Sequence, residues 1–279
     1  MTNTPLLLVD GHNLLWRAAF GFPAEIRSRD KSRDLTAVFG FFALLRVAIR
    51  DEFPRSEVLV VFDGEHGTDG RKQEDTGYKA HRPTDDGALT PILALPQVKE
   101  GLDLHQIAWI EIDTAEADDV IATLVNLDPQ RPTRILSTDR DYYQVLTDSI
   151  HVLNTCMRPG KRHVGPAQVH ERYGVTPAQW ASFRALSGDK SDNIPGVTGI
   201  GDKTAARLLA DDLLLEDLPA SGRLTGRAGD RVRSQWEQAL IWHRMITMDT
   251  AIPLPTKPSG AASAPLPAPA TVVEELGLW

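Results

Sequence analysis

The residues of this sequence with the clearest capacity for chemistry are aspartates that follow short apolar runs. Each of three such runs reads as a buried strand that leads into an aspartate: residues 6–9 into Asp10, 58–62 into Asp63, and 135–136 into Asp139. Helical apolar spacing over residues 35–50 and 120–127 would supply the crossovers between parallel strands. The strand ends of a parallel sheet meet along one edge, where such sheets bind their ligands. The three carboxylates are therefore expected to face one another.

Further acidic residues bring the number of candidate ligands to nine. They are Glu116, Asp118 and Asp119; Asp141, next but one to Asp139; and Asp189 with Asp192. Aspartate is also the preferred residue of helix N-caps and turns, and this ordinary role remains open for any one of the acids alone. Carboxylates gathered in one cleft repel one another unless they bind protons or cations. Because hard oxygen ligands stand here without Cys or paired His, the pattern favours Mg²⁺ or Mn²⁺ over zinc.

Two divalent ions about 4 Å apart, held by carboxylates, are an arrangement that hydrolyses phosphodiesters by in-line attack of water. Charge that develops on the phosphate requires cations outside the metal cluster. Lys79 and Arg82, in the long segment 64–103 that follows Asp63, are the candidates, and Tyr78 is predicted to stack on an unpaired base. A solvated charged loop is the alternative interpretation of this segment.

Helical geometry limits how the Glu116 cluster can serve one site. At 3.6 residues per turn, Glu116 and Asp119 share a helix face while Asp118 points away from Glu116. If all three act together, the helix must begin within the cluster or some of the acids must act through water.

A glycine-rich segment, residues 194–204, separates helices predicted at 178–186 and 204–209. It is not a Walker A loop, because Asp202 interrupts the spacing and no strand precedes it. Exposed amides of such a hairpin, together with the start of the next helix, hold phosphate oxygens without reading bases. The residues expected to contact a DNA backbone are Gly196, Gly199, Gly201, Lys203, Thr204 and Arg207. A simple turn between helices is the alternative.

Composition describes an ordinary globular chain of 279 residues with a net charge of −8, a sign that argues against a polyanionic partner. Without the nine candidate ligands, however, 29 acidic residues stand against 30 basic ones. Basic residues elsewhere suggest tracks for duplex phosphates at 158–162 and at Arg223, Arg227, Arg231 and Arg233. The single cysteine, Cys156, excludes an intramolecular disulfide and fits a reducing cytoplasm. The N-terminus lacks the features of a signal peptide, and no membrane association is expected.

The change in character along the chain predicts three parts. Residues 1–175 read as an α/β nuclease domain, and 176–252 as a helical DNA-binding subdomain with one long helix at 231–248. The apolar stripe of that helix is predicted at Trp236, Leu240 and Ile241. Residues 253–279 form a Pro/Ala-rich tail, which we expect to be an extended linker or disordered.

Taken together, these motifs resemble the 5′-nuclease (flap endonuclease) family, which includes the N-terminal 5′–3′ exonuclease domain of bacterial repair DNA polymerases and stand-alone bacterial and phage relatives. The matching segments are 8–11 with Arg17, 61–64, 78–79 with 82–83, 116–119, 138–141 and 188–201. The resemblance spans about residues 6–253. It implies a PIN-like α/β fold with a parallel sheet flanked by helices, a helical arch at 64–103, and a helix-three-turn-helix at 186–209. Because the chain ends at Trp279, we expect a stand-alone 5′ nuclease.

The resemblance also implies roles for particular residues. One metal group would comprise Asp10, Asp63, Glu116 and Asp118 with Asp119 nearby, and the other Asp139, Asp141, Asp189 and Asp192. A monovalent cation, usually K⁺, would bind the backbone carbonyls of Leu186, Ser187, Pro195, Val197 and Ile200. Lys79, Arg82, Tyr78 and Arg17 would complete the catalytic site.

The expected activity is a Mg²⁺- or Mn²⁺-dependent 5′–3′ DNA exonuclease with flap endonuclease activity, used in replication and repair. Its substrates would be DNA with 5′ ends or 5′ flaps, and RNA primers on DNA. We expect a monomer in the cytoplasm, associated with the nucleoid. Two alternatives remain open: a DNA-junction binding module without catalysis, and a PIN-type ribonuclease.

Overall fold

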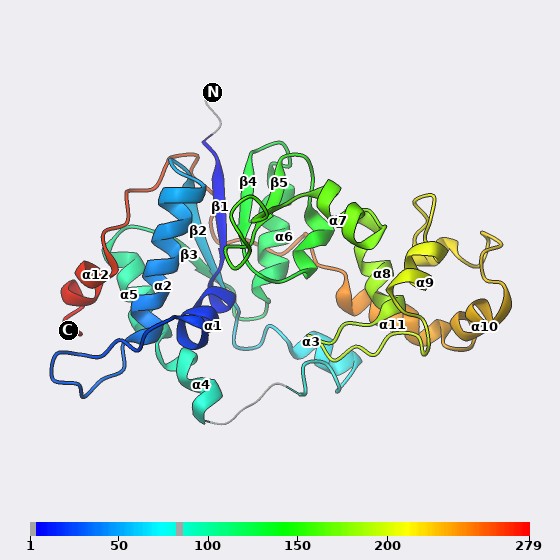
Figure 1. The fold of residues 1–279 in the computed structure, drawn as a ribbon, viewed down its shortest axis with the longest axis horizontal. Coiled ribbons are helices and arrows are strands. Elements are labelled where there is room, and N and C mark those ends of the chain that lie inside the picture. Colours follow the sequence, from blue (N-terminus) through cyan, green and yellow to red (C-terminus); the bar gives the residue numbers. More distant parts are fainter. Residues whose placement is uncertain (1–3, 82–85) are drawn as a thin grey trace.

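A six-stranded sheet organises the first part of the chain in a computed structural model that describes residues 4–81 and 86–279 (Figure 1). The strands are β1 (Leu6–Asp10), β2 (Glu57–Phe62), β3 (Ala108–Glu111), β4 (Thr133–Leu136), β5 (Ile150–Leu153) and β6 (His163–Val164). Their order across the sheet is β3-β2-β1-β4-β5-β6. Strands β1 to β5 pair in parallel, as predicted, whereas the short β6 runs antiparallel to β5.

Helices surround this sheet and continue beyond it. They are α1 (Gly11–Gly21), α2 (Thr36–Val47), α3 (Asp69–Glu74), α4 (Asp86–Leu93), α5 (Leu95–Leu104), α6 (Ala117–Leu127), α7 (Pro166–Tyr173), α8 (Trp180–Ser187), α9 (Asp202–Leu208), α10 (Gly226–Ser234), α11 (Trp236–Ile246) and α12 (Pro269–Glu275). A π-helical turn, Ala48–Glu52, extends α2, and short 3₁₀ turns lie at Asp141–Val145, Pro177–Gln179 and Leu215–Asp217. No helix in the described ranges is long and apolar enough to cross a membrane.

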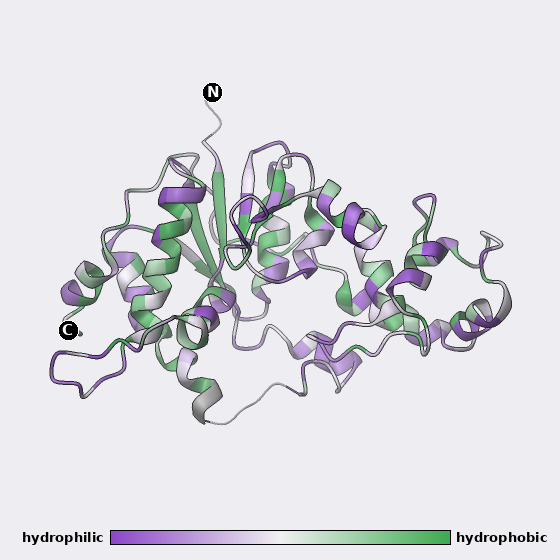
Figure 2. Ribbon diagram, viewed as in Figure 1, coloured by the Kyte–Doolittle hydropathy of each residue, from purple (hydrophilic) through white to green (hydrophobic). Residues whose placement is uncertain are grey.

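The central strand divides the hydrophobic core into two layers. Leu6 and Leu8 of β1 point into one cluster, and Leu7 and Val9 point into the other, as the two-residue period of a strand requires. Helices α1, α2, α5 and α12 cover the second face, while α6 to α11 pack with the first (Figure 1). Burial on both faces explains why this strand is continuously apolar (Figure 2).

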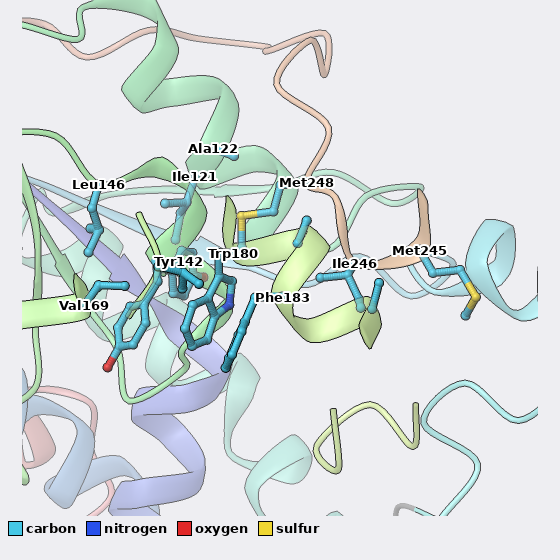
Figure 3. Close-up of a cluster of buried hydrophobic side chains, with 14 of the residues drawn as sticks. Ile121, Ala122, Tyr142, Leu146, Val169, Trp180, Phe183, Met245, Ile246 and Met248 are labelled. Carbon is cyan, nitrogen blue, oxygen red and sulfur yellow. The ribbon is translucent and has the colours of Figure 1, made fainter. Parts of the chain in front are cut away.

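An aromatic cluster joins the sheet domain to the helices that follow it. The ring centroids of Trp180 lie 4.9 Å from Tyr143 and 5.5 Å from Phe183. Figure 3 shows Trp180 and Phe183 beside Tyr142 and Met248 in the same buried layer. Because this core is continuous, α8 and the loop that follows it are held against the sheet domain.

The prediction of a single long helix at 231–248 is wrong, because two helices meet at Gln235. The backbone of Gln235 is not helical (φ −119°, ψ 21°), and its side-chain oxygen accepts hydrogen bonds from Thr198, 37 residues away. The predicted stripe is also displaced, since the buried residues of α11 are Ala239, Trp242, Met245 and Ile246.

The tail is not the extended linker or disordered segment that its composition suggested. It runs along the sheet domain, where Ser263 pairs with the backbone of Ser56 and Val58, and ends in α12 packed on α2. Leu266, Val272 and Val273 are buried there. A few well-placed apolar residues thus anchor a segment that is too poor in them to fold alone.

Candidate functional site

Asp10 lies at the carboxyl end of β1 and begins the acidic site. It caps α1 by accepting a hydrogen bond from the Asn13 backbone (3.0 Å), and its other oxygen accepts from Ser137 (3.0 Å) and Tyr142 (3.2 Å). Burial, together with the nearby charge of Asp63, raises the pKa of Asp10 to about 7. The carboxyl group therefore occupies a place where negative charge is disfavoured unless a cation is near.

Asp63, at the end of β2, fixes the position of the Glu116 cluster. Its Oδ1 accepts a hydrogen bond at 2.7 Å from the backbone N–H of Ala117, which is the first residue of α6. Glu116 is the N-cap of that helix. The helix therefore begins within the acidic cluster, which is the condition under which Glu116, Asp118 and Asp119 can serve one site.

Arg71, from α3, is largely enclosed by these acids, with 15 % of its side chain exposed, and was not singled out from the sequence. Its guanidinium donates to Glu116 at 2.6 Å and to both carboxylate oxygens of Asp119 at 2.8 and 2.9 Å. Its Nε donates to the carbonyl of Met245 at 2.8 Å. One side chain thus ties the segment after β2 to α6 and to the end of α11.

Lys79 and Tyr78 complete the surroundings of Glu116. The Lys79 ammonium donates to one carboxylate oxygen, and the Tyr78 hydroxyl donates to the other at 3.0 Å. Burial opposes ionisation of Glu116, but the charges of Lys79 and Arg71 lower its pKa below the ordinary value. Lys79 also lies 3.8 Å from Asp192, and so it touches acids from two segments.

The second group of predicted ligands comes from the loops after β4 and α8. Asp139 Oδ1 accepts from the backbone of Asp141 at 3.0 Å. Asp189 binds the Arg184 guanidinium at 2.7 and 2.9 Å and accepts from the Ser191 backbone at 2.8 Å. Burial opposes the charge of Asp189, but Arg184 brings its pKa below the usual range.

All nine predicted acids belong to one electrostatically connected group. The pKa of Asp141 is raised well above its ordinary value by burial and then by the charges of Asp139, Asp192, Asp189 and Asp118. Burial, followed by the charges of Glu116 and Asp119, does the same to Asp118. Asp10 connects to Asp63 and Asp139 in the same way. The structure therefore brings together acids that are as far as 182 residues apart in the sequence.

The donor chemistry of this group suits hard divalent cations. The side chains supply only carboxylate oxygens, and the pKa values of Asp10, Asp118 and Asp141 are raised by burial and then by neighbouring carboxylates, so a bound cation would favour their charged forms. Among the residues that the structure describes, no three His, Cys, Asp or Glu side chains are already arranged around a single ion position. Arg71, Lys79 and Arg184 pair with part of the group.

The glycine-rich hairpin closes on itself by backbone contacts. Asp189 and Ile194 exchange backbone hydrogen bonds of 2.7 Å. A Cβ atom on Gly196 would lie 2.2 Å from the Gly188 nitrogen, so a side chain has no room at that crossing. A cleft of about 730 Å³ runs from Asn13 and Asp139 to the hairpin. Two of the candidate ligands, Asp139 and Asp189, therefore line one space with the hairpin.

Carbonyls predicted to bind a monovalent cation lie along the same hairpin. Those of Leu186 and Val197 accept backbone hydrogen bonds of 2.9 Å from Val197 and Ile200. The Ser187 hydroxyl is buried and has no hydrogen-bond partner among the described residues. A buried hydroxyl without a partner is a place where a water molecule or an ion can bind. Lys203 and Arg207 are exposed on α9, as a phosphate-binding role requires.

Two predicted catalytic residues make other contacts than expected, and a third lies outside the residues that the structure describes. Tyr78 is only 2 % exposed with its hydroxyl on Glu116, so its predicted role of stacking on a base is wrong for this structure. Arg17 donates to Thr155 at 2.7 Å rather than to an acid of the site. Arg82 lies outside the described residues. Arg71 was missed because it stands among other charged residues, and its buried acidic partners are 45 to 48 residues away.

Comparison with known proteins agrees with the predicted fold and family. The family model described as 5'-3' exonuclease, N-terminal resolvase-like domain, matches residues 5–174, and that described as 5'-3' exonuclease, C-terminal SAM fold, matches residues 175–267. The thermostable DNA polymerase I of Thermus aquaticus is 41 % identical over 215 residues, 76 % of this chain and 24 % of that protein. DNA polymerase I of Bacillus subtilis is 35 % identical over 270 residues, 91 % of this chain and 29 % of that protein.

The chain thus spans about a quarter of the length of the curated relatives it matches. A crystal structure of the bacteriophage T5 flap endonuclease with DNA and metal ions is similar at a TM-score of 0.70 and 20 % identity, covering 88 % of this chain and 90 % of that one. This likeness confirms the predicted fold. The two family models together cover nearly all of the chain, which therefore belongs to the 5′–3′ exonuclease family.

Proposed function

We propose that this protein hydrolyses phosphodiester bonds of DNA from the 5′ end and at 5′ flaps, with two Mg²⁺ or Mn²⁺ ions. The observation that carries the proposal is the single connected group of nine carboxylates, contributed by five segments of the chain. A protein that only binds DNA gains nothing from crowded acids facing a polyanion. Membership of the 5′–3′ exonuclease family supports the direction of cleavage.

Eight of the nine acids would hold the ions in two groups, Asp10, Asp63, Glu116 and Asp118 for one and Asp139, Asp141, Asp189 and Asp192 for the other. When bound, such ions supply an activated water and stabilise the leaving oxygen. Asp119 instead serves Arg71, which engages both of its oxygens. Arg71 thereby orients the neighbouring Glu116.

Among the described residues, Lys79 is the candidate best placed to act on the phosphate itself. Its ammonium stands between Glu116 and Asp192, which belong to different segments of the acidic group. A cation at that position stabilises charge that develops on a phosphate bound over the acids. The exposed amides of the hairpin and the side chains of Lys203 and Arg207 would hold the DNA backbone, with K⁺ bound among the carbonyls beside Ser187.

The expected setting is replication and repair in the cytoplasm, in association with the nucleoid, with RNA primers on DNA as further substrates and the monomer as the active form. The T5 relative is described with DNA and metal ions. The polymerases of Thermus aquaticus and Bacillus subtilis carry the similar sequence within a longer chain. Both comparisons support DNA as the substrate.

Incubation of the protein with a 5′-labelled flap duplex, a blunt duplex and a single-stranded RNA, in Mg²⁺, Mn²⁺ or EDTA, tests the proposal. We expect release of the flap and of short 5′ products in either metal and none in EDTA. D141N should abolish cleavage while DNA binding remains measurable. Cleavage of RNA alone would identify a PIN-type ribonuclease, and binding without cleavage in any divalent ion would identify a junction-binding module.

A further inference from the structure

Helix α10 and the turn before it carry four arginines that the sequence does not distinguish, but the structure separates them into two kinds. Arg223 forms an ion pair with Asp211, and Arg233 forms one with Asp230. Both also donate to backbone carbonyls, Arg223 to Arg207 at 3.1 Å and Arg233 to Leu224. These two side chains are occupied in stabilising the local structure.

The other two arginines are not paired with an acid. Within the described part of the chain, Arg227 forms neither an ion pair nor a hydrogen bond, and Arg231 donates only to the carbonyl of Gly199 at 3.1 Å. Both are exposed. Because they are four residues apart on α10, they lie on one face of the helix. Figure 2 shows this helix as largely hydrophilic.

A matching row stands on α9. Lys203 and Arg207 are also four residues apart and exposed, and neither forms an ion pair with any described residue. The glycine hairpin connects the two rows, since Arg231 touches Gly199 while Lys203 follows the hairpin directly. Four cations without acidic partners among the described residues therefore flank one backbone turn.

The hairpin and α10 are fixed relative to each other by two contacts. Gln235, just after α10, accepts from the backbone and the hydroxyl of Thr198 at 3.2 and 3.1 Å. Gly199 has a left-handed backbone (φ +75°), and a Cβ atom there would lie 2.1 Å from the Arg231 guanidinium. The guanidinium is thus seated on the hairpin rather than free to move away from it.

We propose that Arg227 and Arg231 form a second row of phosphate contacts for duplex DNA, beside the row formed by Lys203 and Arg207. The inference rests on the proposed function, because it takes DNA as the substrate. A duplex presents two backbones, which suits two cationic rows on separate helices. Single strands are held by aromatic stacking, and residues 188–235 contain no Phe, Trp or Tyr. The surface is therefore suited to backbone phosphates and not to unpaired bases.

The expected size of the effect follows from counterion release. Each phosphate that the protein neutralises contributes about −0.9 to the slope of log K against log salt concentration for B-DNA. At a salt concentration of about 0.1 M, a variant that neutralises one phosphate fewer therefore binds about eightfold more weakly, and one that neutralises two fewer binds about sixtyfold more weakly. The slope itself should become less steep by about 0.9 for each phosphate that is no longer neutralised.

Fluorescence anisotropy with a labelled flap duplex in EDTA measures these quantities without cleavage. R227Q and R231Q should each lower affinity about eightfold and together about sixtyfold at about 0.1 M salt. R223Q and R233Q serve as matched controls, because both arginines are already paired with acids, and they should stay within about twofold of the wild type. Thermal melting of each variant checks that it is folded; R227Q removes no hydrogen bond or ion pair within the described residues and should melt like the wild type.

The outcomes separate this inference from the proposed function. If the wild type neither binds nor cleaves the flap duplex, the proposed function itself is wrong. If the wild type does both and the R227Q/R231Q double variant binds with unchanged affinity and salt slope, only the second row is wrong. An equal loss of affinity for single-stranded DNA, or an equal loss in R223Q and R233Q, would also overturn the assignment to duplex phosphates.

Discussion

Replacing Arg71 with methionine is the sharpest perturbation that the site offers. The substitution keeps a long side chain but removes every hydrogen bond that the guanidinium donates, three of them to Glu116 and Asp119 and one to the carbonyl of Met245. Glu116 and Asp119 are 3 % and 7 % exposed, so water cannot replace the missing partner. The variant tests whether these acids depend on one buried cation.

The expected loss of stability can be worked from those hydrogen bonds. Breaking a buried ion pair by removing one partner costs about 3–5 kcal/mol. In R71M, Glu116 keeps its hydrogen bonds from Lys79 and Tyr78, and Asp119 keeps the one from the backbone N–H of Asp249. We therefore expect a loss at the lower end of that range, about 3 kcal/mol. For a chain of this size that loss lowers Tm by about 6–10 °C. R71K keeps the charge but not the bidentate geometry, so its Tm should lie between those of the wild type and R71M.

The effect of R71M on stability should depend on pH. Burial opposes ionisation of Glu116, but Lys79 and Arg71 hold its pKa below the ordinary value. The pairing therefore stabilises the fold at pH values above the ordinary pKa of a glutamate, and this stabilisation is lost as the pH falls through the lowered pKa of Glu116. The difference in free energy of unfolding between the wild type and R71M should therefore be largest near neutral pH and should shrink below about pH 4. Urea unfolding followed by circular dichroism in EDTA measures it. A gap below about 1 kcal/mol at neutral pH, or one that does not narrow in acid, would refute the buried-clamp interpretation.

Three further predictions address the rest of the site and the tail. Lys79→Ala should lower single-turnover cleavage of a flap duplex at least about 100-fold while DNA binding persists, and a near-normal rate would remove Lys79 from the site. In EDTA the protein should lose stability as the pH rises from about 4, the ordinary pKa of an aspartate, to about 7, the raised pKa of Asp10. Mg²⁺ should raise the Tm more at about pH 7 than at about pH 5, and an equal rise at both would contradict this. Deleting residues 259–279 removes three buried aliphatic side chains, and at about 1.5–3 kcal/mol each it should lower the Tm by about 10 °C or more in calorimetry, whereas an unchanged Tm would show that the tail is not anchored.

The strand-end aspartates could be predicted because their strands are buried on both faces. Residues 6–9 and 58–62 are continuous apolar runs, and such runs are recognisable without knowledge of their neighbours. Strand β3 was missed because two of its four residues, Ala108 and Glu111, are exposed, which removes the pattern. The split of the predicted long helix depends on a contact between Gln235 and Thr198 that no local pattern reveals.

The tail and Arg71 were beyond sequence reasoning for a related reason. Composition correctly indicates that residues 253–279 cannot build a core, but it does not show that α2 and α5 offer a place for Val272. Gly101 of α5 has no side chain, and a Cβ atom there would lie 3.3 Å from Val272 and 2.5 Å from Phe42. Likewise, the charged run around Arg71 has the composition of a solvated loop. Only the fold places its guanidinium beside acids from α6.

The acidic group is divided between carboxylates whose charge is favoured in the folded chain and carboxylates whose charge is not. Asp119 and Glu116 are held by Arg71 and Lys79, and Asp189 is held by Arg184. The carboxyl groups with raised pKa values are Asp10, Asp118 and Asp141, because burial and neighbouring acids outweigh any cation near them; Arg71 approaches Asp118 only to 4.0 Å. A bound divalent cation would lower the energy of these three most, because it balances charge that their surroundings disfavour. The paired acids can then act mainly by fixing geometry. Asp119 through Arg71 reaches α3 and Met245 of α11, and α11 packs against α8, the helix that leads into the hairpin.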